Sequence, residues 1–119
     1  MKILFLALAL FYCSASAADP WRTEDTYWEA AYLTVHTLDW AQTHTIAANP
    51  DKFFEHNPAL GEHPDSAQIN TYFALTALVH YGIARKLPSG WRTGFQGVTF
   101  AIETISVVRN FSLGIGGSF

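Results

Sequence analysis

The chain has 119 residues, which is enough for one domain with a modest core and too few for two domains. Seven Lys and Arg residues stand against ten Asp and Glu residues, so no basic excess supports binding to nucleic acid. Charged residues make up 14% and aromatic residues 15% of the chain, a balance that favours a membrane or another interface over open water.

Residues 1–18 are predicted to form a cleavable signal peptide. Lys2 precedes an uninterrupted apolar run, and small residues follow that run up to Ala18. A charged start, an apolar middle and a small-residue end are typical of a secretory signal. Residues 19–119 would then form the single mature domain, which lacks cysteine because Cys13 is the only one in the chain. We expect export to the bacterial cell envelope, either to the inner membrane or to the periplasm.

Three helical segments are predicted after the leader, over about residues 26–48, 66–86 and 90–110. No run shows sustained strand alternation, so the predicted fold class is all-α, a small three-helix bundle. Residues 49–65 form an acidic, proline-rich loop, in which each proline moves the residue before it out of the helical region. A short turn at residues 87–90 joins the second and third segments.

Charge and hydropathy together predict a membrane hairpin made of the second and third helices. Arg85, Lys86 and Arg92 flank the short turn, which favours its placement on the cytoplasmic side, whereas the acidic loop suits the outside. The first helix carries too many polar side chains for lipid, so we expect it to be periplasmic. The apolar parts of the other two helices are about 14 to 16 residues long, whereas a span needs about 20. A soluble exported bundle is therefore the alternative.

Polar side chains form one line along each predicted helix. On the third helix the line is spaced by three and four residues, which is one narrow side of a helix, and it consists of Gln96, Thr99, Glu103, Ser106 and Asn110. The first helix repeats this spacing with Glu29, Tyr32, His36, Asp39 and Thr43, and the second offers Tyr72, Thr76 and His80. If the three lines turn inward, a candidate polar core forms from His36, Asp39, His80 and Glu103.

The chemistry of this candidate core leaves several interpretations open. Two imidazoles and two carboxylates are ligands that suit zinc, manganese or iron, and they also provide an acid and a base for proton transfer. The same residues could form a structural hydrogen-bond network or a solvated surface. Glu103 is the only charge between Phe95 and Val108, and in lipid such a carboxylate requires a partner, for which His36 or His80 are the candidates.

The loop over residues 49–65 contains further candidates. Glu55, Asn57 and His63 stand next to other acids and histidines, so weak metal binding is conceivable there. Asn57 precedes a proline, and the simpler interpretation is that its side chain braces a turn.

Several dipeptides and single residues together resemble a group of small, uncharacterised helical envelope and membrane proteins of proteobacteria and their prophages. They are Leu38-Asp39, Gln42-Thr43, Asn49-Pro50, Glu55, Asn57-Pro58, Leu60-Gly61, His63-Pro64, Tyr72-Phe73, His80, Leu87-Pro88 and Trp91-Arg92. The resemblance covers most of the mature chain and implies placement in a membrane or envelope. It directs attention to Asp39, Asn57, His80 and Glu103 and supplies no reaction.

The leading functional hypothesis is a small exported or membrane-embedded helical envelope protein that acts by interaction. Its partner would be the membrane, another protein or further copies of itself as a homo-oligomer. A prophage-encoded protein that modifies the host envelope would fit this hypothesis. One alternative is a small membrane metalloenzyme or proton-transfer protein that uses the His/Asp/Glu cluster. Another is a soluble periplasmic binding module. The sequence favours a protein without enzymatic activity but names no cofactor or ligand.

Overall fold

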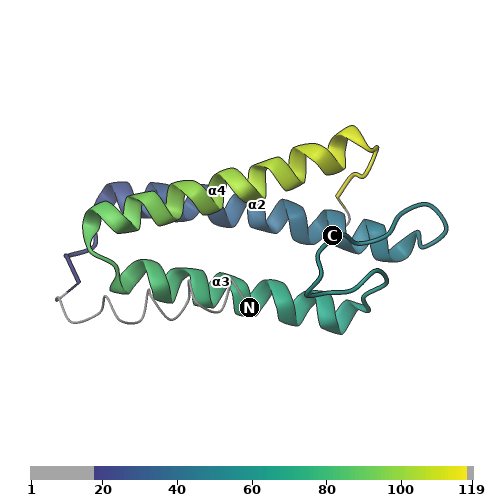
Figure 1. Cartoon of the computed structure of the whole chain (residues 1–119), viewed down its shortest axis with the longest axis horizontal. Coiled ribbons are helices and arrows are strands. Elements are labelled where there is room, and N and C mark those ends of the chain that lie inside the picture. The colour runs from purple at the N-terminus through teal and green to yellow at the C-terminus, as the bar shows by residue number, and fades with distance from the viewer. Residues whose placement is uncertain (1–17, 118–119) are drawn as a thin grey trace.

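The computed structural model describes residues 18–117 and contains three α-helices within them (Figure 1). These are α2 (Thr23–Ala48), α3 (Ser66–Lys86) and α4 (Ser89–Ser112). The predicted all-α fold with three helices is confirmed, and the helix bounds lie within three residues of the predicted ones. The predicted signal peptide, apart from Ala18, lies outside the described residues.

Local sequence explains where the helices begin. The side chain of Asp25 accepts a hydrogen bond from the backbone amide of Arg22 at 2.8 Å, and this cap starts α2 earlier than predicted. Asp65 and Gln68 form a reciprocal capping box at the start of α3, with donor–acceptor distances of 2.8 and 2.9 Å. Pro88 ends α3 and fixes the extended backbone from which α4 starts.

The loop between α2 and α3 is ordered by its own backbone and by Asn57. The Asn57 side chain accepts a hydrogen bond from the amide of Ala59 at 3.0 Å, and its carbonyl accepts one from Leu60 at 3.0 Å. The amide of Glu55 donates to the carbonyl of Glu62 at 2.9 Å, which closes the loop on itself. Asn57 therefore braces a turn, as the sequence indicated.

α2 is the central helix. It packs along both α3 and α4, whereas α3 and α4 contact each other less. In Figure 1 the start of α2 lies at the same end as the turn between α3 and α4, and the loop of residues 49–65 lies at the other end together with the end of α4. We call these two ends the turn end and the loop end.

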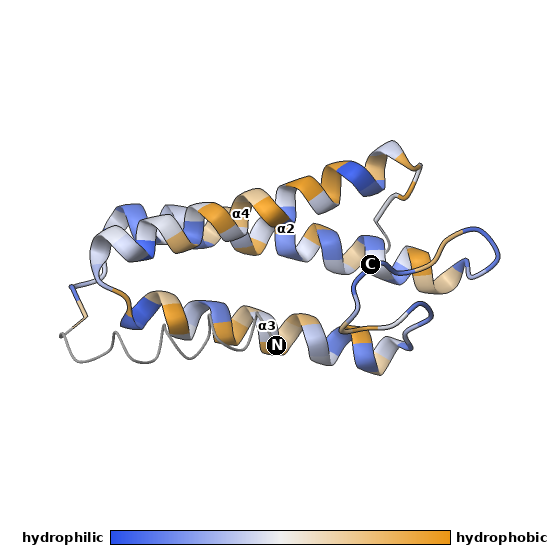
Figure 2. Cartoon of the chain, in the orientation of Figure 1, coloured by the Kyte–Doolittle hydropathy of each residue, from blue (hydrophilic) through white to orange (hydrophobic). Residues whose placement is uncertain are grey.

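The bundle buries charged and polar side chains beside its apolar core and exposes many large apolar side chains. Its buried polar and charged residues are Asp25, Glu29, His36, Gln42, Thr43, His80, Arg92 and Gln96. The exposed large apolar side chains lie mainly on α3 and α4, whose apolar residues Figure 2 marks in orange, and include Leu75, Leu78, Val79, Val98, Ile102, Ile105 and Val108. A soluble bundle normally exposes its charges and buries such large apolar side chains.

Helix length and hydropathy do not identify a membrane span. Within residues 18–117, none of the three helices combines the length and the apolar content that crossing a bilayer requires. The membrane hairpin expected from the sequence therefore stays a prediction.

Candidate functional site

The three polar lines face one another along the axis of the bundle. They form two histidine sites, and each site takes one residue from each helix. In the His36 site, the imidazole of His36 from α2 lies between Glu103 of α4 and Thr76 of α3. Its Nδ1 is 2.7 Å from Oε1 of Glu103, and its Nε2 is 3.1 Å from both Oγ1 of Thr76 and the carbonyl of Phe73.

The acceptors around His36 determine its charge. Nε2 must carry a hydrogen, because the Phe73 carbonyl can only accept. Nδ1 then either donates to the Glu103 carboxylate or accepts a proton from Glu103. Burial opposes a positive charge on His36, but the hydrogen bond and the negative charge of Glu103 outweigh it and raise the pKa of His36. The partners of His36 therefore favour its protonated form.

The His80 site also combines a histidine, a glutamate and a threonine from three helices, but each residue type comes from a different helix than in the His36 site. His80 comes from α3, Glu29 from α2 and Thr99 from α4. Nδ1 of His80 is 2.9 Å from Oε1 of Glu29, and its Nε2 is 2.7 Å from Oγ1 of Thr99. Thr99 donates its own hydrogen to the Phe95 carbonyl at 2.8 Å, which leaves its oxygen free to accept. Both nitrogens of His80 therefore face acceptors.

Glu29 is held as a carboxylate although it is buried. Burial raises its pKa, but the hydrogen bonds from His80 and from Gln96, whose Nε2 lies 2.9 Å from Oε2 of Glu29, outweigh burial and lower it. Gln96 also donates to the Asp25 carbonyl at 3.1 Å. Its Oε1 is the one buried side-chain polar atom among the described residues that lacks a hydrogen-bond partner. Glu29 thus links the His80 site to the turn end.

Tyr32 lies between the two histidine sites. Its ring stacks on His80 with centroids 3.5 Å apart and on His36 with centroids 5.1 Å apart. Phe95 covers the other side of His80 at 4.6 Å, so four rings form one column through the core. Such stacking fixes the orientation of the two imidazoles. Burial, followed by the charge of Glu103, raises the pKa of Tyr32, so its hydroxyl stays neutral.

A pocket opens beside the His36 site at the loop end. It has a volume of about 360 Å³ and lies between α2, α4 and the loop, where Asp39, Glu55, Asn57, Glu103 and Arg109 line it with other residues. Burial, followed by the charges of Glu103 and Glu55, raises the pKa of Asp39 to about 7. A carboxyl group that titrates near neutral pH, next to a second carboxylate and open to a pocket, can donate or accept a proton.

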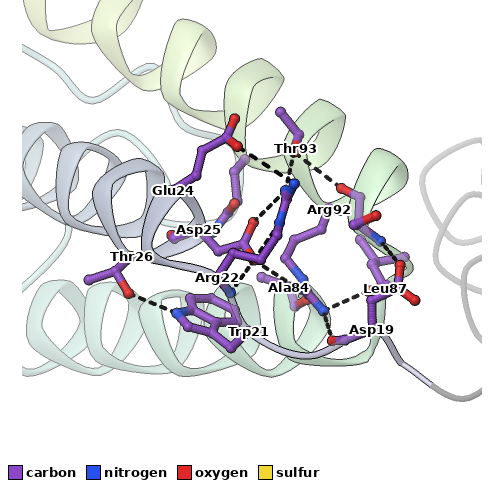
Figure 3. Close-up of polar contacts among 12 residues, drawn as sticks. Asp19, Trp21, Arg22, Glu24, Asp25, Thr26, Ala84, Leu87, Arg92 and Thr93 are labelled. Atoms are coloured by element: carbon purple, nitrogen blue, oxygen red, sulfur yellow. Dashed lines mark hydrogen bonds and ion pairs between the residues drawn. The ribbon is translucent and has the colours of Figure 1, made fainter.

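Arg92 organises the turn end, where Figure 3 shows its contacts. Its guanidinium is fully buried, and all five of its N–H groups have an acceptor. The acceptors are the carbonyls of Asp19, Pro20, Ala84 and Leu87 at 2.7 to 3.1 Å, and Oδ2 of Asp25 at 2.7 Å. We call Arg92 and these acceptors the Arg92 cluster. It ties the segment before α2 to the end of α3 and the start of α4.

Asp25 balances the charge of Arg92. Burial raises the pKa of this carboxyl, but hydrogen bonds from Arg22 and Arg92 outweigh burial and lower the pKa to about 2. The carboxylate is therefore ionised over the whole physiological pH range. An ion pair whose hydrogen-bonding groups are all satisfied positions helices and leaves no group available for chemistry.

The structure divides the predicted polar core between two places. His36, Asp39 and Glu103 lie together, whereas His80 belongs to the other site and reaches them only through the ring of Tyr32. Two of the loop candidates, Glu55 and Asn57, line the pocket together with Asp39. His63 is exposed and does not line that pocket.

Sequence reasoning missed the residues of the turn end. Asp25 and Arg92 are both fully buried, and neither belongs to the polar lines. Each stands four residues before the first member of a line, Asp25 before Glu29 and Arg92 before Gln96, so one further step of the same spacing was the signal that would have found them. Glu29 could have been found, since it stands seven residues before His36 on the same line.

The metal interpretation gains no support from this geometry. Among residues 18–117, no three His, Cys, Asp or Glu side chains are grouped so that they could hold a metal ion. Comparison with known proteins found no match to the chain among family models, curated sequences or solved structures. Function must therefore be argued from the surface and the core of this molecule.

Proposed function

We propose that the protein is a small helical protein of the bacterial envelope that acts by interaction, with the outer sides of α3 and α4 in contact with membrane lipid. The observation that carries the proposal is the combination of charges paired inside the bundle with many large apolar side chains exposed on α3 and α4. Burying charges in a bundle whose exterior is apolar is expected when the surroundings are apolar as well.

The apolar side chains form continuous surfaces. On α4, Val98, Ile102, Ile105 and Val108 are each at least 60% exposed, and their spacing places them on the side opposite the polar line. On α3, Leu75, Leu78 and Val79 lie opposite His80 in the same way. Single exposed apolar residues are ordinary, but a strip along each of two helices indicates an interaction surface.

Membrane contact through these strips does not require either helix to cross the bilayer. A helix with one apolar side can lie in the headgroup region with that side inserted among acyl chains. The membrane hairpin predicted from the sequence would be a deeper form of the same contact. The proposed role of a prophage protein in modifying the host envelope rests on the resemblance alone.

Cell fractionation tests the proposal. We expect the wild-type protein to stay with membranes through a high-salt wash, which removes proteins bound by charge alone, and the double variant Ile102→Asp/Ile105→Asp to be released. Both positions are exposed, so the substitutions should leave the bundle folded, which circular dichroism would check. Tyr27→Asp/Phe54→Asp is the matched control, because it alters two exposed aromatic residues outside α3 and α4. Release of the wild type by the wash would overturn the proposal and favour the soluble binding module.

The pocket at the loop end favours a second candidate, a proton-transfer protein. Asp39 titrates near neutral pH, is open to the pocket and lies beside the His36–Glu103 pair, so a proton can pass between solvent and core at this point. Purified protein reconstituted in vesicles that contain a pH-sensitive dye would test this. We expect faster decay of a pH gradient with the wild type than with Asp39→Asn, and equal rates would exclude this candidate.

A further inference from the structure

We infer that the turn end of the bundle binds the headgroups of anionic phospholipids, and that this contact sets how the protein is oriented on the membrane. The inference rests on the proposed membrane contact and adds which end of the bundle faces the headgroups and what charge they carry. It draws on three features: unpaired basic side chains, exposed aromatic rings and the opposite charge at the loop end.

Two basic side chains at the turn end are free to meet an anionic surface. Arg85 and Lys86 are exposed, and among residues 18–117 neither has an ion-pair partner. The other two arginines of this end are already neutralised, because Arg22 pairs with Glu24 and Asp25, and Arg92 pairs with Asp25. The carboxylate of Asp19 at this end accepts a hydrogen bond from the amide of Ser89 at 2.6 Å.

Aromatic rings lie between the basic side chains and the apolar strips. Trp91 is 68% and Tyr81 46% exposed, and the Arg85 guanidinium lies 5.2 Å from the ring of Trp21 and 5.9 Å from that of Tyr81. Tryptophan and tyrosine prefer the level of the headgroups, where one part of the ring is wet and the other apolar. Stacking on these two rings fixes the position of the Arg85 guanidinium and leaves its positive charge unneutralised.

If α3 enters the surface at a tilt, with its C-terminal end in the headgroups, the order of its side chains matches the depth profile of a bilayer surface. From the end of the helix inward, basic Arg85 and Lys86 come first, then Tyr81, and then Val79, Leu78 and Leu75. At a rise of about 1.5 Å per residue, the step from Arg85 to Leu75 covers about 15 Å. Headgroup and upper acyl regions extend over a similar distance, since a bilayer of about 40 to 45 Å contains a hydrocarbon core of about 30 Å.

The charge of the loop end disfavours contact with anionic headgroups. Its loop carries four acids, Asp51, Glu55, Glu62 and Asp65, against the single base Lys52. Arg109 of α4 adds one exposed base at this end. The excess of negative charge repels an anionic surface within about a Debye length, so electrostatics favours one orientation only.

Vesicle binding by the purified full chain tests the inference. The probes are vesicles of phosphatidylcholine alone and vesicles in which part of it is replaced by phosphatidylglycerol. We expect the wild type to bind the anionic vesicles about tenfold more tightly, with the difference shrinking at high salt. Arg85→Gln/Lys86→Gln should lose this preference and keep its binding to phosphatidylcholine. Lys52→Gln/Arg109→Gln, which removes the same charge from the loop end, should keep the preference.

Each other outcome identifies which idea fails. Equal binding of the wild type to both kinds of vesicle would overturn the inference and leave the proposed membrane contact standing. Loss of preference in the loop-end variant as well would also overturn it, because net charge rather than the turn end would then decide. If Arg85→Gln/Lys86→Gln lost binding to both kinds of vesicle, the two residues would not act through headgroup charge. Failure of the wild type to bind either kind of vesicle would refute the proposed function and the inference together.

Discussion

At the turn end every N–H of the Arg92 guanidinium has an acceptor, whereas at the loop end the carboxyl groups of Asp39, Glu55 and Glu103 face one pocket. The first arrangement lowers the pKa of Asp25 to about 2, and the second raises the pKa of Asp39 to about 7. Both groups are aspartates on α2, separated by fourteen residues. Burial raises the pKa of both carboxyls, but the arginine partners of Asp25 outweigh it, whereas the neighbouring carboxylates of Asp39 add to it.

The two ends of the bundle therefore differ in role. Fixed charge at the turn end holds the helices together, and titratable charge at the loop end is left accessible. The two histidine sites lie between them and connect α2, α3 and α4 in the same manner. Substitutions at the two ends should therefore differ in the size and the pH dependence of their effects.

The largest effect is expected for Arg92→Met. The substitution leaves the Asp25 carboxylate without one of its cationic partners and four carbonyls without donors, and losing one partner of a buried pair typically costs about 3 to 5 kcal/mol. Chemical denaturation would measure the change in the free energy of unfolding. Lys86→Met removes an exposed charge nearby and should leave stability close to that of the wild type. Equal stability of the two variants would show that the Arg92 cluster does not hold the bundle together.

An intermediate effect is expected at the His80 site. Glu29→Gln should destabilise the protein by about 2 kcal/mol and Glu103→Gln by about 1 kcal/mol. A charged hydrogen bond contributes more to the free energy of unfolding where it is better shielded from water. The side chain of Glu29 is 7% exposed and that of Glu103 is 19% exposed. The pKa of Glu29 is lowered by folding, so its contribution is present above the unfolded value of 4.5 and is lost as pH falls through the folded pKa. Denaturation of Glu29→Gln and wild type should therefore converge in acid.

The fold and part of the site could be predicted because helical periodicity is a local property. The polar lines of α2 and α4 repeat at three and four residues, and such spacing alone puts Glu29, His36 and Asp39 on one side of α2. Whether that side faces inward depends on what the other helices offer. The matching polar lines on α3 and α4 indicated that this side of α2 faces inward.

The partners across helices could not be predicted because they depend on the register between helices. α3 runs antiparallel to α2, so the step from Thr76 to His80 moves one turn toward the start of α2. Thr76 meets His36, and His80 consequently meets Glu29 rather than Asp39 or Glu103. A loop of different geometry between α2 and α3 would shift these pairs without altering any polar line.

A smaller effect of opposite sign is expected for Asp39→Asn. Folding raises the pKa of Asp39 from 3.8 to about 7, so the native state holds a proton that the unfolded state releases, and stability declines as pH rises through that range. Removing the ionisable group should stabilise the protein at pH 8, by a few kcal/mol at most since one pKa unit corresponds to about 1.4 kcal/mol, and change little near pH 4. Thermal denaturation at both pH values would measure this. Asp51→Asn, at an exposed position in the loop, is the control and should show no such pH dependence.

The smallest effect on stability is expected for Asn57→Ala, which makes it a sensitive probe of why the loop end titrates as it does. The substitution removes the hydrogen bond from the amide of Ala59, at a cost of about 0.5 to 1 kcal/mol, and loosens the loop that covers Asp39. Because burial is the main cause of the raised pKa of Asp39, admitting water should lower that pKa toward its ordinary value. Carbon-13 NMR titration of the carboxyl group would follow the change, with His63→Ala as a control on the exposed side of the same loop. An unchanged titration in Asn57→Ala would mean that Glu103, rather than cover by the loop, keeps the proton on Asp39.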